Sequence, residues 1–388
     1  MARLERVGEK KYRIVYDVPP TNGRVRQQKT ETLEGVTKGE AQAILAKRKE
    51  AAAKCERVAD ASITVSELFE KFMGTRRRLA ATTRDRYNSL YATYIRPELG
   101  SLKIASLKKM NLIQAYAAWE ARGERRPSGR TIRHAHDLVR ATLNWAVSVD
   151  YIATNVAAKV TTADLPRITK PENTVLDETE LRRLLAEAKK PTKRAKARGT
   201  LSSQPWFYPA VAFAACTGAR RGEVLAVKWT DLDLDNASVT IRSSLSEPRS
   251  GLAFKEPKNG KTRSIVLPSQ LVAILRTHKA KQASERLALG EGYQEQGLVM
   301  AQPDGTPVPP WNFGAAFKDL VARAGVTPIT LHDLRDTHAS LLAKAGVPIE
   351  VVSQRLGHSG IGVTVERYLT VYTSRDAAAA EAFARLIR

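Results

Sequence analysis

The sequence predicts a multidomain α+β protein. We expect a small three-stranded sheet with one helix, then an all-α bundle, then a mostly α domain with a small antiparallel sheet. Alternating strand patterns are confined to residues 3–32 and 238–267. Residues 62–158 show only helical periodicity. Residues 161–173 contain two prolines and no apolar periodicity, so they separate the bundle from the last domain.

The composition points to a polyanionic partner. The chain has 388 residues and a formal net charge of +23, with an isoelectric point near 10.1. A surface charge of this size and sign is typical of proteins that bind duplex DNA or RNA. Aromatic residues make up only 6% of the chain, which argues against stacking on single strands. We find no apolar run long enough for a membrane span and no signal-peptide core, so we expect a cytoplasmic protein.

Residues 1–58 are expected to form the first domain. Three candidate strands precede a helix that starts with the capping-box signature at Thr37 to Glu40. The strand faces opposite the apolar one carry basic side chains that could lie in a DNA groove: Arg13, Arg24, Arg26 and Lys29. The alternative is a solvated sheet face on a packing module.

Residues 62–158 are expected to form four helices. The first is capped at Thr64, the second starts at Thr82 or Thr83 and ends before Pro97, and the third runs from Ser106 to Gly123. The fourth extends from about residue 131 to 149. Arginines cluster at loops and helix starts, where phosphate contacts are usual: Arg76, Arg77, Arg78, Arg84 and Arg130. Taken alone, an arginine of this kind is more often a solvated surface residue than a specific DNA contact.

Residues 174–388 form the third expected domain. After a basic loop at 189–204, an apolar helix ends at Thr217-Gly218, and a new helix begins near Ala219. Arg220 and Glu223 stand three apart there, so the carboxylate can hold the guanidinium. Alone, such a pair is more often a surface salt bridge than a site.

A hairpin is predicted from residues 252–256 and 262–267, joined by an Asn-Gly turn that places Lys258 at its tip. A mobile ammonium there can enter a groove and protonate a leaving oxygen. The nearby GKT string is not a P-loop, because Lys255 stands where the earlier glycine is required.

The stretch 331–369 reads as helix, turn, helix, turn, with Gly346 and Gly357 as helix ends. His332 and Arg335 are expected on one helix face, followed by His358 and Tyr368. A phenol has an unperturbed pKa of about 10 and needs a cationic site to act as a nucleophile. Guanidinium groups that clamp a phosphate would supply that site. The plainer alternative is a surface helix face and a packed aromatic side chain.

Five motifs occur in order between residues 217 and 368: TGARRGE, PKNGKTRSIVLP, HDLR, LGH and a following tyrosine. In this the sequence resembles the tyrosine recombinase, or phage integrase, family. The resemblance implies that Arg220 and Arg335 bind the scissile phosphate, with Glu223 in support. It further implies that Lys258 is the general acid and that His332 hydrogen-bonds the phosphate and assists proton transfer. His358 occupies the position that holds His or Trp in the family, and Tyr368 would form a 3′-phosphotyrosyl bond. Tyr372 is the rival nucleophile.

The resemblance also implies an arm-site DNA-binding domain, a core-binding domain and a catalytic domain, with a homotetramer forming on paired DNA sites. An excision factor and a host DNA-bending protein are possible partners. Because a phosphotyrosine preserves the phosphodiester bond energy, no cofactor is expected. The alternatives are a type IB topoisomerase-like relaxing enzyme and a non-catalytic DNA-binding regulator. The arm-like domain argues against the first, and the occupied catalytic positions argue against the second.

Overall fold

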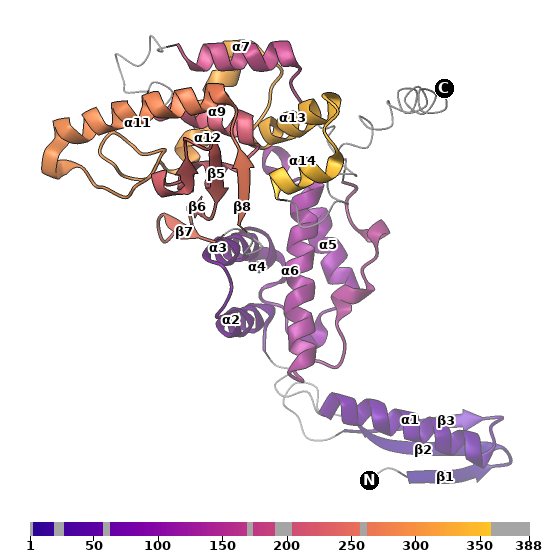
Figure 1. The fold of residues 1–388 in the computed structure, drawn as a ribbon. Coiled ribbons are helices and arrows are strands. Elements are labelled where there is room, and N and C mark those ends of the chain that lie inside the picture. Colours follow the sequence, from indigo (N-terminus) through magenta and orange to yellow (C-terminus); the bar gives the residue numbers. More distant parts are fainter. Residues whose placement is uncertain are drawn as a thin grey trace, which may run out of the picture. The chain divides into compact units, whose positions relative to one another are not determined.

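A computed structural model describes residues 3–18, 27–56, 63–168, 174–190, 204–256 and 262–357. The chain divides into two compact units, Met1–Lys170 and Pro171–Arg388. Figure 1 shows the order of the elements along the chain. Within the described ranges, no helix is both long and apolar enough to cross a bilayer.

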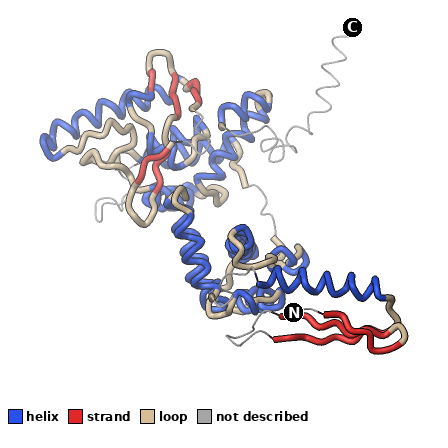
Figure 2. The backbone as a smooth tube through the Cα atoms, turned by 90° about the horizontal axis from the view of Figure 1, so that it is seen from below, coloured by secondary structure: helices blue, strands red, loops and turns tan. Residues whose placement is uncertain are grey.

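The N-terminal part of the first unit is a sheet covered by one helix, as predicted. Its antiparallel strands, in the order β1-β2-β3, and its helix are β1 (Arg3–Gly8), β2 (Lys11–Val18), β3 (Gln27–Glu34) and α1 (Lys38–Glu56). The helix lies along one face of the sheet (Figure 2), and Ile14, Tyr16 and Leu45 form the buried contact between them. The predicted capping box is present, because the Glu40 carboxylate accepts the backbone N–H of Thr37 at 2.8 Å.

The rest of the first unit is helical, with its own core around Leu68, Trp119 and Leu138. Its helices are α2 (Val65–Thr75), α3 (Ala81–Leu90), α4 (Arg96–Leu99), α5 (Lys109–Glu120) and α6 (Gly129–Ser148). The predicted cap of α2 is confirmed, since Thr64 and Glu67 form a reciprocal capping box. A separate core for each part explains why the strand and helix patterns change so sharply along the sequence.

Two predicted helix boundaries in this unit are wrong. The second helix does not end before Pro97; a π-helical turn at Tyr91–Ile95 carries α3 into α4, whose first turn contains the proline. The proline falls where the π-helical hydrogen bonding, in which the Arg96 N–H donates to the Tyr91 carbonyl, gives way to α4. The third helix starts at Lys109, because the Ser106 hydroxyl donates to the Lys103 carbonyl at 3.0 Å and closes a separate 3₁₀ turn.

The second unit is mostly helical, as expected. Its helices are α7 (Glu178–Ala188), α9 (Phe207–Thr217), α10 (Arg221–Ala226), α11 (Ser269–Leu289), α12 (Pro310–Ala324), α13 (Leu331–Lys344) and α14 (Ile349–Leu356). Helix α9 is apolar on all sides and most of its side chains are buried. It therefore forms the core element against which α7, α11, α12 and α13 pack. Its fixed position makes its C-terminal end a rigid base for a site.

The predicted pairing of the hairpin is wrong. The strands here are β4 (Leu232–Asp233), β5 (Ser238–Ile241), β6 (Ser244–Ser246), β7 (Ala253–Lys255) and β8 (Arg263–Val266). Strand β8 pairs with β5, whereas β7 pairs with β6, so the two predicted arms belong to different sheets. Buried Val239 and Ile265 face each other across β5 and β8, and this apolar contact selects that pairing. The turn that carries Lys258 lies outside the described residues.

Candidate active site

The junction of α9 and α10 positions Arg220. Gly218 ends α9 in the left-handed conformation, with φ of 64°, and Arg220 then caps α10 in an extended conformation. The Glu223 carboxylate accepts the backbone N–H of Arg220 at 2.9 Å and also its Nη1 at 2.9 Å. The side chain of Arg220 is 41% exposed, so its guanidinium is oriented by Glu223 and still reaches solvent.

A second guanidinium shares the same carboxylate. Arg263 on β8 places Nη2 2.6 Å and Nη1 3.3 Å from the two oxygens of Glu223, which is 2% exposed. Burial alone raises the pKa of Glu223. The hydrogen bond and charge of Arg263, aided by Arg220, outweigh burial and lower the pKa to about 2. Glu223 is thus a buried anion between two cations.

Sequence reasoning missed Arg263, although a signal was present. Arg263 and Ile265 are two apart on a strand, so they point to the same face, and Ile265 is part of the core. A basic side chain on the inward face of a strand needs an acidic partner. The carboxylate predicted to support Arg220 supplies it.

Arg335 joins the ends of two helices. It is 2% exposed, and its Nη1 and Nη2 donate to the carbonyl oxygens of Gly218 and Leu356, each at 2.6 Å. Its helix, α13, begins at a capping box between Thr330 and Asp333. The Arg335 guanidinium therefore contacts the backbone carbonyl two residues before Arg220 and the last carbonyl of α14.

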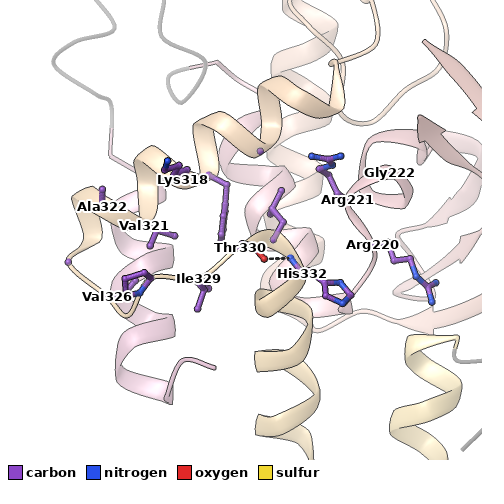
Figure 3. A pocket seen from close by; sticks show the side chains of 15 residues that line it. Arg220, Arg221, Gly222, Lys318, Val321, Ala322, Val326, Ile329, Thr330 and His332 are labelled. Carbon is purple, nitrogen blue, oxygen red and sulfur yellow. Dashed lines mark hydrogen bonds between the residues drawn. The ribbon is translucent and has the colours of Figure 1, made fainter. Parts of the chain in front are cut away.

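The prediction that His332 and Arg335 share one helix face is wrong: His332 lies on the exposed side of α13, whereas Arg335 is buried. It lines a hollow of about 870 Å³ together with Arg220. Figure 3 shows the two side chains on the same side of this hollow, whose rim also carries Arg221 and Lys318. The floor is apolar and includes Phe317. A basic rim that is open to solvent can bind an anionic group.

A buried histidine supports the base of this arrangement, and sequence reasoning missed it as well. His338 Nδ1 bonds to the Ala215 carbonyl at 2.8 Å, and its Nε2 accepts the Nε–H of Arg355 at 3.2 Å. This pattern requires a neutral ring protonated at Nδ1. Burial, followed by the charge of Arg355, lowers the pKa of His338 to about 4. Arg355 also donates to the carbonyls of Cys216 and Val266, so it links α14 to α9 and β8.

The remaining predicted site residues fall into two groups. Lys258, His358, Tyr368 and the rival Tyr372 lie outside the described residues, as do Arg24 and Arg26. Among the DNA-binding candidates that are described, most are exposed: Arg13, Lys29, Arg76, Arg77, Arg78 and Arg130. Arg84 is half-buried and donates to the Arg76 carbonyl at 2.8 Å, so it also stabilises the turn between α2 and α3.

Comparisons with known proteins agree on one family. The phage integrase family model matches residues 174–375. A XerC-like tyrosine recombinase from Caldanaerobacter subterraneus subsp. tengcongensis is 28% identical over 76% of this chain and 76% of its own length. The integrase of Mycobacterium phage FRAT1 is 26% identical over 85% of this chain and 89% of its own.

Solved structures share the fold. The integrase of the transposon Tn1549, solved with circular intermediate DNA, has a TM-score of 0.65 at 20% identity and covers 79% of this chain and 95% of its own. A lambda integrase dimer bound to a core site has a TM-score of 0.59 at 16% identity and covers 94% of both chains. The second of these comparisons extends over nearly the whole chain, including residues N-terminal to the helical bundle.

Proposed function

Since the chain belongs to the phage integrase family of tyrosine recombinases, we propose that it breaks and rejoins duplex DNA with Tyr368 as the nucleophile. It is a site-specific DNA recombinase.

In the proposed mechanism, Arg220 and Arg335 bind the non-bridging oxygens of the scissile phosphate. Their charge stabilises the phosphorane-like transition state, where the phosphate gains negative charge. The Tyr368 oxygen attacks phosphorus, a 3′-phosphotyrosyl bond forms, and the 5′ oxygen leaves. Lys258 protonates that oxygen. His332 and His358 assist by hydrogen bonding to the phosphate and by moving the proton of the phenol.

The observation that carries this proposal is the convergence on the end of α9. Arg220 follows Gly218 by two residues, and Arg335 donates to the Gly218 carbonyl at 2.6 Å. Residues far apart in sequence therefore meet at one helix end, and His332 lines the same hollow as Arg220. A guanidinium and an imidazole that line one hollow, with the buried Arg335 bonded to the helix end just before Arg220, suit a phosphodiester, which needs charge stabilisation in several directions.

We further propose three functional domains. Residues 1–58 would bind arm-type sites, residues 62–158 would bind the core site, and residues 174–388 would carry out catalysis. The exposed arginines at the turn after α2 and at the start of α6 would contact the DNA backbone. The active assembly would be a homotetramer on two core sites in the cytoplasm. It would integrate and excise a phage or another mobile element, with an excision factor and a host DNA-bending protein setting the direction.

Covalent trapping tests the catalytic assignment. The protein is incubated with a nicked suicide duplex that carries its attachment core, denatured, and examined for a shifted protein–DNA band. We expect a band that disappears in Tyr368→Phe and remains in Tyr372→Phe, with DNA binding intact in both variants. A band lost only in Tyr372→Phe would show that Tyr372, and not Tyr368, is the nucleophile. No band on the correct core, despite binding, would support a non-catalytic regulator.

A further inference from the structure

Arg263 connects two parts of the site that the proposed mechanism treats separately. Its terminal nitrogens bind both oxygens of Glu223, at 2.6 and 3.3 Å. Its Nε donates to the Arg355 carbonyl at 3.0 Å, in the last turn of α14. The side chain is 9% exposed, so it is enclosed between the start of α10 and the end of α14.

The end of α14 fits closely around this side chain. A Cβ placed on Gly357 would lie 2.9 Å from Arg263 Cδ and 3.0 Å from its Nη1. Gly357 also has φ of 66°, a conformation that favours glycine. The absence of a side chain at Gly357 therefore leaves the space that the guanidinium occupies. Arg263 is fixed at both ends, by one hydrogen bond to backbone and by one buried ion pair.

We propose that Arg263 is a positioning residue for Arg220 in DNA cleavage. Anchored on α14, it holds one side of the Glu223 carboxylate, and the other side of that carboxylate holds Arg220 Nη1 at 2.9 Å. Without Arg263, Glu223 loses its stronger partner and can turn toward Arg220, which would draw that guanidinium away from the phosphate. This inference rests on the proposed role of Arg220 at the scissile phosphate.

The shared carboxylate gives this arrangement a specific electrostatic effect. Glu223 carries one negative charge between two guanidiniums, so Arg220 keeps part of its positive field toward solvent. If Arg263 were removed, Glu223 and Arg220 would form a neutral pair. Loss of Arg263 should therefore slow cleavage most where the phosphate accumulates negative charge. A merely structural role would slow cleavage of charged and neutral linkages equally.

The experiment measures single-turnover cleavage of the nicked suicide duplex at saturating protein. Arg263→Met removes both contacts, and Arg263→Lys keeps the charge but cannot reach Glu223 and the Arg355 carbonyl together. Arg276→Met is the matched control, because Arg276 pairs with Asp235 at 2.7 Å and its side chain is 57% exposed. Each variant is tested on a normal scissile phosphate and on a methylphosphonate, whose neutral linkage needs less cationic stabilisation.

On the normal phosphate we expect the rate to fall about 100-fold in Arg263→Met and about 10-fold in Arg263→Lys, with DNA binding within twofold of the unaltered protein. On the methylphosphonate both losses should shrink to less than about fivefold. Arg276→Met should cleave both substrates normally. If Arg263→Met fails to fold, the rates of Arg263→Lys on the two substrates test whether Arg263 positions Arg220.

Equal losses on both substrates, or cleavage within twofold of normal in a folded Arg263→Lys or Arg263→Met variant, would overturn the inference. The proposed function is tested separately, by whether the unaltered protein forms a covalent complex that depends on Tyr368. Failure of that complex concerns the catalytic assignment, whereas the two-substrate comparison concerns Arg263 alone.

Discussion

Replacing Gly218 by alanine should damage both the fold and the proposed active site. Gly218 has φ of 64°, which costs an L-residue about 1–2 kcal/mol. The new Cβ would also lie 2.7 Å from Leu356 Cδ2 and 2.8 Å from His338 Cδ2. Leu356 is fully buried and His338 is held by hydrogen bonds on both ring nitrogens, so neither can move freely. Overpacking of this kind costs about 1–3 kcal/mol more.

Gly325→Ala provides a matched control. Gly325 ends α12 as Gly218 ends α9, with φ of 58°, but nothing lies within 4 Å of a Cβ built there. Its cost should therefore be only the backbone penalty, about 1–2 kcal/mol. The difference between the two variants isolates the contact of Gly218 with Leu356 and His338 from the conformational preference of glycine.

The assay is urea unfolding followed by hydrogen exchange in peptides of α9, which reports this unit separately from the N-terminal one. We expect Gly218→Ala to lower the free energy of unfolding by about 2–5 kcal/mol. Because Gly218 and Leu356 supply the carbonyls that hold Arg335, covalent complex formation should fall as well, by at least about 10-fold. The reasoning is refuted if Gly218→Ala destabilises α9 no more than Gly325→Ala does.

Three further outcomes are expected. Since the folded pKa of His338 is about 4 against an ordinary value of 6.5, the unfolded chain binds more protons between these values, so about 3 kcal/mol of stability should be lost as pH falls from 6.5 to 4. This loss of stability between pH 6.5 and 4 should be missing in His338→Phe. Glu223→Gln should cost about 3–5 kcal/mol of unfolding free energy near neutral pH, measured by urea unfolding, whereas Glu178→Gln at an exposed pair should cost under about 1 kcal/mol. The pKa of Glu223 is lowered to about 2 in the folded protein. The stabilisation that its charge contributes to the unfolding free energy is therefore complete above pH 4.5 and is lost as the pH falls toward 2. Thr330→Ala should lower the free energy of unfolding by about 1 kcal/mol, because α13 loses its N-terminal cap, and thermal unfolding should detect this. Thr277→Ala on α11 removes no cap and should not have this effect.

Local sequence signals located most elements of this protein. The sequence predicts helix caps at Thr37 and Thr64 because each is followed three residues later by glutamate, and the structure has capping contacts at both. Gly346 and Gly357 were recognised as helix ends, and both have positive φ. Such signals depend on neighbours within four residues, so they can be evaluated without knowing the fold.

Features set by distant partners were harder to predict. The hairpin at Lys258 was paired wrongly, because the turn signal is local and the choice of β5 as the partner of β8 depends on the core. In the candidate site, the pairing of Arg220 with Glu223 is a local contact. The Arg263–Glu223 pair spans 40 residues and the contact from Arg335 to Gly218 spans 117. Neither partner could be identified from spacing alone.

The same long-range contacts explain why stability and chemistry should be linked at this site. The C-terminal ends of α9 and α14 present carbonyl oxygens to one region, and a helix end of this kind carries partial negative charge. Arginines bind these oxygens: Arg335 at Gly218 and Leu356, Arg263 at Arg355, and Arg355 at Cys216. In the protein without DNA, Arg335, which is proposed to act on the phosphate, therefore also holds the ends of α9 and α14 together. A loss of cleavage after an arginine substitution here can be assigned to chemistry only when hydrogen exchange shows that α9 and α14 have kept their positions.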